Sequence, residues 1–158
     1  MSTSDSGTNR REFLAAGSIG AAILLAGGKA RAADDKLTAA ETANEKVVND
    51  FCAAWESMDV EKIGSYLDDD VSFRMIDTAP VVEGKDKVVA GFPAFFERLD
   101  SARFEMLRSV AMGTVVVNDR IDHFHHKDGK KDAYHITGVF VVKGGKIVEW
   151  RDYLLPTG

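Results

Sequence analysis

An arginine and an aspartate stand two residues apart in NDRIDHF, the stretch from Asn118 to Phe124, which otherwise has the composition of a β-strand. Because a strand directs residues i and i+2 to one face, the side chains of Arg120 and Asp122 are expected to point the same way. On an outer face they would form an inert salt bridge. Inside a pocket they would be buried charges, which are costly without partners and are therefore candidates for acid–base chemistry.

Asp152 is a second charged residue in an apolar setting. In the segment KIVEWRDYL it shares a predicted strand face with Trp150 and Leu154. A carboxylate in that position needs a partner inside the protein. Arg120 and Asp122 are the best-matched candidates for that partner.

Helices are predicted in the first half of the chain. Apolar residues at helical spacing, with Thr38 and Glu41 as a capping box, predict a long helix over residues 38–59. A short helix is expected over 60–67, followed by Asp68–Asp70, which is either a solvated loop or a cation site. A third helix is expected over 85–99, where Pro93 predicts a kink or a break near Phe92.

Strands dominate the rest of the chain. A short strand is expected over 71–76, and an alternating pattern predicts four more over 103–111, 114–125, 132–143 and 146–154. The turns between these four fall at Met112-Gly113, Asp128-Gly129 and Gly144-Gly145. Helices followed by an antiparallel meander predict an α+β domain over residues 33–158, in which a curled, mostly antiparallel sheet wraps around about three N-terminal helices.

Three segments carry a family resemblance: VVVNDRIDHF, YHITGVFVV and GGKIVEWRDYL. Over about Ala43 to Leu154 the sequence resembles the limonene-1,2-epoxide hydrolase family. That family lies within the SnoaL-like, NTF2-like superfamily of cone-shaped domains, which includes ketosteroid isomerase. The resemblance implies an enzyme without a cofactor that opens a small lipophilic epoxide. It also implies a triad at the bottom of an apolar cavity, with Asp122 as general acid, Asp152 as base and Arg120 as the bridge between them.

Epoxide opening explains why these residue types would be needed. A proton must reach the departing oxygen while a nucleophile attacks carbon, so one carboxyl must be neutral and the other charged. An apolar surround and mutual repulsion raise the pKa of one carboxyl, while an arginine keeps the other ionised. The planar guanidinium fork can hold both carboxyl groups at once.

Apolar side chains are expected to line the substrate cavity. They are Phe73, Met75, Phe92, Phe95, Phe96, Met106, Phe124 and Trp150. Phe73 and Met75 stand where the family has a Tyr and an Asn that hold the attacking water. The alternatives are therefore an isomerase or lyase acting on an apolar small molecule, or a SnoaL-like binding protein without turnover.

Other residues with reactive side chains have simpler interpretations. His123, His125 and His126 could ligate a metal, but no third ligand follows at motif spacing, so a solvated strand end is the simpler interpretation and no metal site is predicted. His135 is a lesser candidate for a general base. Cys52 lies on the buried stripe of the first helix, which indicates core packing. Arg151 is expected in a surface or dimer ion pair.

The first 32 residues have the layout of an export signal. Arg10 and Arg11 precede an apolar run that ends in the small-residue site Ala30-Arg31-Ala32. The paired arginines followed by Phe13-Leu14 resemble a bacterial twin-arginine signal. The run is short and glycine-rich for a membrane anchor. Cleavage after Ala32 and a periplasmic location are expected.

Composition limits the partners of the mature chain. Without residues 1–32 it holds 16 basic and 23 acidic residues, a net charge of about −7, which disfavours nucleic acid and anionic lipid. Cys52 is the only cysteine, so no intrachain disulfide can form. The family resemblance implies a homodimer built through the outer face of the sheet.

Overall fold

The computed structural model describes residues 36–156. The predicted export signal, residues 1–32, lies outside the described residues. The first element is α1 (Ala39–Ala54), and its N-terminus has the predicted capping box: the Glu41 backbone N–H donates to Thr38 Oγ1 at 3.2 Å, and the Thr38 N–H donates to Glu41 Oε2 at 2.8 Å. These bonds satisfy donors that a helix start leaves free. None of the helices between residues 36 and 156 is long and apolar enough to cross a bilayer.

Two short helical segments follow α1. The 3-10 turn η1 (Trp55–Ser57) ends at Met58, whose φ of 49° turns the chain. Asp59 then caps α2 (Val60–Gly64) by accepting hydrogen bonds from the first backbone N–H groups. The long helix predicted over 38–59 is therefore shorter than expected and is closed by a tight turn.

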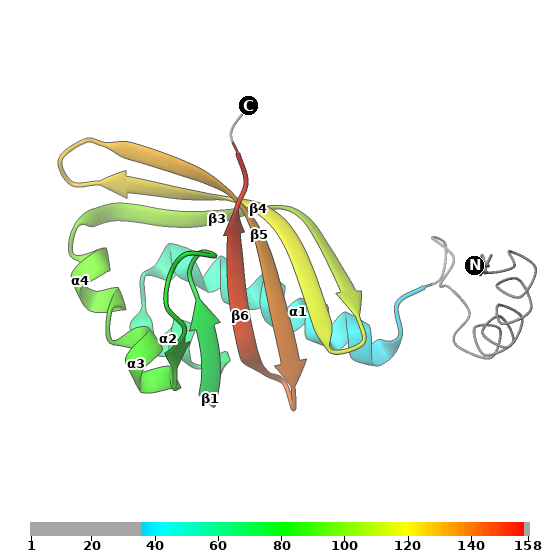
Figure 1. Ribbon diagram of the computed structural model, residues 1–158. Helices are drawn as coiled ribbons and strands as arrows, with labels where there is room; N and C mark the ends of the chain where they lie inside the picture. Colours follow the sequence, from blue (N-terminus) through cyan, green and yellow to red (C-terminus); the bar gives the residue numbers. More distant parts are fainter. Residues whose placement is uncertain (1–35, 157–158) are drawn as a thin grey trace, which may run out of the picture. The chain divides into compact units, whose positions relative to one another are not determined.

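The helix predicted over 85–99 is divided in two. It forms α3 (Lys85–Val89) and α4 (Phe92–Phe96), with Pro93 in the first turn of α4. The predicted break near Phe92 is confirmed, because proline has no N–H to continue the ladder of a preceding helix. Helix α3 lies against β1 and β2, and α4 lies next to α3 and contacts β3 (Figure 1).

Six strands form one sheet in the order β2-β1-β6-β5-β4-β3. Their bounds are β1 (Leu67–Arg74), β2 (Val82–Glu83), β3 (Leu99–Met112), β4 (Val115–His126), β5 (Lys131–Lys143) and β6 (Lys146–Leu154). β1 runs parallel to β6, and every other pair is antiparallel. Several expected boundaries differ. The helix expected over 60–67 ends at Gly64, and β1 takes in Leu67 and Asp68–Asp70 but ends two residues before the predicted strand. β3 starts four residues earlier than the predicted strand.

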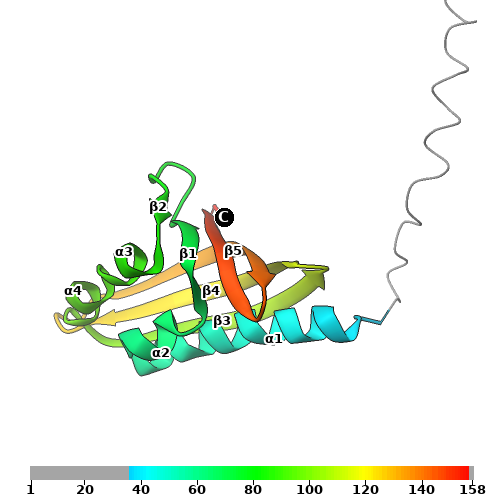
Figure 2. The same ribbon diagram turned by 90° about the horizontal axis from the view of Figure 1, so that it is seen from below.

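The core lies between α1 and the inner face of the sheet (Figure 2). Aromatic rings fill much of it: Phe51 of α1 meets Trp150 of β6 edge to face at 5.0 Å, and Trp55 stacks on Phe104 of β3 at 4.5 Å. Burying a large apolar side chain contributes about 1.5–3 kcal/mol. The predicted α+β architecture, with a curled and mostly antiparallel sheet around a few helices, is confirmed.

Candidate active site

Arg120 lies on the inner face of β4 and is fully buried, with 0% of its surface exposed. Strand alternation places Asn118 and Asp122 on the same face, and both are buried as well. The outer-face alternative for the Arg120 and Asp122 pair is therefore wrong. A buried guanidinium is tolerable only when its N–H groups are paired.

The guanidinium of Arg120 contacts two carboxyl groups. Its Nε donates to Asp122 Oδ1 at 2.8 Å and its Nη2 to Asp122 Oδ2 at 3.2 Å. The same Nη2 donates to Asp152 Oδ2 at 2.7 Å. The side chains of Asp122 and Asp152 are only 8% and 7% exposed. The structure thus brings together the three residues that the sequence predicted as a set.

Gly138 explains how Arg120 reaches Asp152 across a strand that lies between them. In the register of the sheet, Gly138 of β5 is paired with Asn118 of β4 on one side and with Asp152 of β6 on the other. A Cβ atom at Gly138 would lie 2.2 Å from Arg120 Nη1, a contact so short that the guanidinium would have to move. The missing side chain leaves the space that the guanidinium occupies.

Further groups complete the surroundings of the triad. Trp150 Nε1 donates to Asp152 Oδ1 at 2.9 Å, so both oxygens of that carboxyl accept a hydrogen bond. Asn118 Oδ1 accepts from Arg120 Nη1 at 3.0 Å. The guanidinium carbon lies 4.9 Å from the centre of the Phe104 ring, a cation–π distance.

Burial controls the protonation of this site. It raises the pKa of Asp122 to about 6, and the charge and hydrogen bonds of Arg120 offset only part of that effect. Burial also raises the pKa of Asp152, against the opposing influence of Arg120 and of the Trp150 N–H. It opposes the charge on Arg120, but the two carboxylates outweigh it and raise the pKa of the guanidinium. The arginine stays charged, while the carboxyls take up a proton at higher pH than ordinary aspartates.

Most of the predicted lining residues lie on the interior. Phe92, Phe96 and Trp150 are buried, and four others pack partly buried against the core: Phe73, Phe95, Met106 and Phe124. Phe73 lies against Trp150, with ring centres 4.0 Å apart. Met75 differs, because it follows the end of β1 and is 60% exposed. Its expected place among the buried lining residues is not observed.

Two residues at the site, Asn118 and Gly138, were not predicted from the sequence. Asn118 carried a signal, because it lies two residues before Arg120 on the same strand face. Gly138 carried another, since an isolated glycine inside a strand marks the close approach of another group. Tyr134 is also placed near the site: it is paired with Asp122 in the register of β4 and β5 and is 41% exposed.

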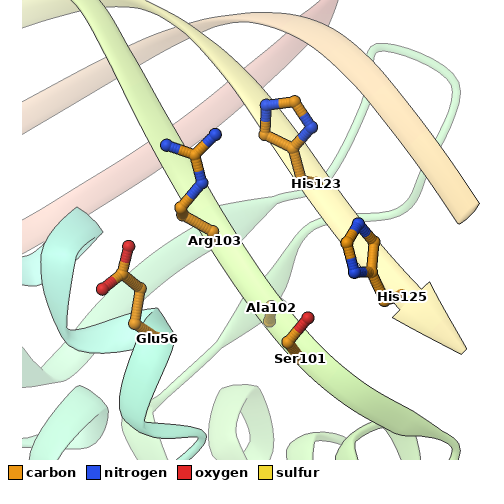
Figure 3. A pocket seen from close by; sticks show the side chains of 6 residues that line it. All are labelled: Glu56, Ser101, Ala102, Arg103, His123 and His125. Atoms are coloured by element: carbon orange, nitrogen blue, oxygen red, sulfur yellow. The ribbon is translucent and has the colours of Figure 1, made fainter.

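A hollow of about 330 Å³ has none of the three triad residues in its lining (Figure 3). Its lining residues are Glu56, Ser101, Ala102, Arg103, His123 and His125. Arg103 and His123 both contact Glu105, at 2.7 Å and 2.9 Å. No group of three or more His, Cys, Asp or Glu side chains within residues 36–156 is arranged to hold a metal ion.

The remaining reactive residues lie outside the triad. His126 contacts Asp132 at 3.0 Å, and His135 contacts Asp119 at 2.6 Å. By strand parity, His135 lies on the opposite face of β5 from Ile136, which is paired with Arg120. Burial raises the pKa of the Cys52 thiol to about 12, so it stays neutral.

Arg151 forms an ion pair with Glu149, two residues away on β6. Both side chains are about one-third exposed. The pair lies on the opposite face of β6 from Asp152, and both the surface and the dimer alternatives expected for Arg151 stay open.

Comparisons with known proteins agree with this architecture. A LEH-like epoxide hydrolase from M. tuberculosis is 23% identical, with a TM-score of 0.66 over 73% of this chain and 84% of that one. A putative SnoaL-like polyketide cyclase from Jannaschia sp. CCS1 is 14% identical, with a TM-score of 0.65 over 76% and 90% of the two chains. An uncharacterized cystatin-fold protein from Novosphingobium aromaticivorans is 24% identical, with a TM-score of 0.60 over 69% and 96%.

At these identities the similarity establishes a shared NTF2-like fold, as the family resemblance implied. The sequence itself gives the stronger assignment. Residues 48–150, the greater part of the chain, match the family model of the SnoaL-like domain. The chain therefore belongs to the SnoaL-like domain family.

Proposed function

We propose that this protein is an epoxide hydrolase-like enzyme that needs no cofactor and opens a small lipophilic epoxide. One observation carries the proposal: a single buried guanidinium is hydrogen-bonded to two buried carboxyl groups. The pKa of Asp122 is raised to about 6, which suits a group that must donate a proton near neutral pH. The solved epoxide hydrolase with the same fold supports this choice of reaction.

The reaction follows from the roles of the two carboxyls. Neutral Asp122 donates its proton to the epoxide oxygen as the carbon–oxygen bond breaks. Ionised Asp152 takes a proton from water as the water oxygen attacks the same carbon, and a diol results. Arg120 holds both carboxyls in place, and the proton gained by Asp152 returns to Asp122 before the next turnover. Each positioned acid or base contributes about 10²- to 10⁴-fold to the rate.

A second candidate follows from Phe73. The centre of its ring lies 4.0 Å from that of Trp150, whose indole N–H donates to Asp152. The Phe73 side chain has no polar atom that could hold a water molecule. If no water attacks, the same pair of carboxyls would move a proton within an apolar substrate, as an isomerase or lyase does. The same triad without turnover would serve only to bind a ligand.

Isotope labelling separates these functions. The mature protein is incubated with limonene oxide and styrene oxide in ¹⁸O-water, and the proposal predicts a diol that carries one ¹⁸O atom. Asp122→Asn and Asp152→Asn should each reduce the rate by about 10²- to 10⁴-fold. Asp119→Asn, a carboxyl paired with His135 away from the triad, serves as the matched control and should retain activity. A rearranged, unlabelled product would favour the isomerase, and no product from a broad panel of epoxides would favour a binding protein.

We also propose that the chain is exported by its twin-arginine-type signal and works in the periplasm as a homodimer. The signal-like sequence of residues 1–32 supports export, and the family resemblance supports a dimer. Native mass spectrometry of the protein recovered from a bacterial periplasm tests both points. It should give twice the mass of a chain that begins at Ala33, and an uncleaved or monomeric protein would contradict the corresponding point.

A further inference from the structure

The carboxamide of Asn118 lies at a junction of three elements. Its Oδ1 accepts hydrogen bonds from Arg120 Nη1 at 3.0 Å and from the Gly138 backbone N–H at 3.1 Å. Its Nδ2 faces Cys52 Sγ of α1 at 3.5 Å. The side chain is 1% exposed. Because a guanidinium only donates, the amide oxygen must face Arg120, and the orientation of the amide is thereby fixed.

The guanidinium of Arg120 divides its donors between Asn118 and the two carboxyl groups. Nε and Nη2 of Arg120 serve Asp122 and Asp152, whereas Nη1 donates to Asn118. Without that acceptor, Nη1 would be a buried donor that lacks this partner, which costs about 1–3 kcal/mol. The guanidinium would then rotate to share the two carboxyls differently. With Nη1 bonded to Asn118, Nη1 does not compete with Nε and Nη2 for the two carboxyl groups.

We propose that Asn118 is a positioning residue that locks the Arg120 guanidinium, so that its Nε and Nη2 edge is presented to both carboxyls. This role rests on the proposed function of the triad and adds a residue to it. Groups outside the triad hold the Asn118 amide. The Gly138 backbone N–H of β5 donates to the amide oxygen, and the amide nitrogen faces Cys52 of α1. The hydrogen bonds of the Asn118 side chain go to Arg120, to the Gly138 backbone and to Cys52, and not to either carboxyl group.

A purely structural role for Asn118 makes a different prediction. A buried amide that only stabilises the sheet would lower the stability of the protein when it is replaced, but would leave Arg120 ordered. A positioning role predicts that the guanidinium loses its order. The readout must therefore report on Arg120 itself and must be compared with a variant of equal burial. Val116 supplies that control, because it lies two residues away on the same strand face and is 0% exposed.

Side-chain NMR of ¹⁵N-labelled protein tests the proposal. In the wild type the Arg120 Nε–H, assigned by its loss in Arg120→Lys, should exchange slowly with solvent and the Nη groups should rotate slowly. Asn118→Leu should speed the solvent exchange of Nε–H and the rotation of the Nη groups by about tenfold or more, which corresponds to a decrease of about 1.4 kcal/mol in the activation free energy. Asn118→Asp keeps an oxygen acceptor and should restore the slow rates. Val116→Ala should keep them despite its lower stability.

Two results would overturn the role: an unchanged Arg120 signal in folded Asn118→Leu, or an equal change in Val116→Ala. If Asn118→Leu does not fold, Asn118→Thr gives the same readout, because threonine suits a strand but is too short to reach Nη1. The measurement needs no substrate. An ordered, Asn118-dependent guanidinium in a protein that opens no epoxide would therefore contradict the proposed function alone.

Discussion

Asp122 is the residue on which the proposed chemistry depends most. Burial raises its pKa from the ordinary 3.8 to about 6. Between these two pH values the folded protein keeps a proton that the unfolded chain has lost. The contribution of this group to stability is therefore full below pH 3.8 and is lost as the pH rises through about 6. A carboxyl that disfavours the folded state at neutral pH is typical of a site shaped for function rather than for stability.

The same pKa predicts how activity depends on pH. If neutral Asp122 donates the proton, kcat/KM should fall as the pH rises through about 6. At low pH it should fall again, because Asp152 must be ionised to act as a base. Because the two carboxyls share a guanidinium, their titrations are coupled. The two apparent pKa values of the bell-shaped profile therefore describe the pair of carboxyls together.

Histidine side chains titrate in the same range and require a control. His123→Gln and His135→Gln alter residues paired with Glu105 and Asp119, outside the triad. Both variants should keep the alkaline limb near pH 6. If the alkaline limb disappeared in either variant, the limb would belong to that histidine, and the support for Asp122 as the acid would be lost.

At the scale of elements, the site depends on three neighbouring strands in one register. β4 supplies Arg120 and Asp122, β6 supplies Asp152, and β5 passes between them with Gly138 at the crossing point. The distance from Arg120 Nη2 to Asp152 is 2.7 Å because β5 carries no side chain there. The middle strand is therefore as specific a part of the site as the two strands that carry the charges.

Gly138→Ala should disrupt this arrangement. A Cβ atom would lie 2.2 Å from Arg120 Nη1 and 2.5 Å from Asn118 Oδ1, so these groups must move. We expect a loss of about 1–3 kcal/mol in the free energy of unfolding, measured by urea denaturation, together with loss of activity.

Gly91→Ala is the matched control, because a Cβ at Gly91 meets nothing within 4 Å and the backbone there is helical. This variant should be unchanged or about 0.4–1 kcal/mol more stable. A fully active and equally stable Gly138→Ala protein would contradict the geometry described for the crossing point.

Sequence patterns predicted some of these elements well. Alternation over β4 placed Arg120 and Asp122 on one face, and alternation over β6 placed Asp152 on the apolar face, because the side-chain period of a strand is two. The need of Asp152 for a partner inside the protein, rather than the pattern of β4 itself, favoured the inner face for Arg120 and Asp122. The start of β1 was missed, since three aspartates in a row are untypical of a strand. In β1 they are tolerated because only Val71 and Leu67 nearby need to be buried, and Asp69 and Asp70 stay exposed.

At the scale of the whole molecule, membership of the SnoaL-like family explains the fold and leaves the reaction open. The triad was predictable from two short motifs and a known family pattern. Asn118 and Gly138 were not predicted: each carried a local signal, but their roles depend on which residues are aligned across three strands, and no single segment shows that register. The exposure of Met75 was likewise unpredictable, since it depends on where β1 ends.

The most direct test of the account is the titration of the aspartate carboxyl groups by ¹³C NMR in the protein without ligand. We expect a carboxyl signal with a midpoint near pH 6, which is absent from Asp122→Asn and unaffected in Asp119→Asn. If every aspartate signal instead titrated near the ordinary value of 3.8, Asp122 would be ionised throughout the neutral range, and the proposed proton donor would not exist.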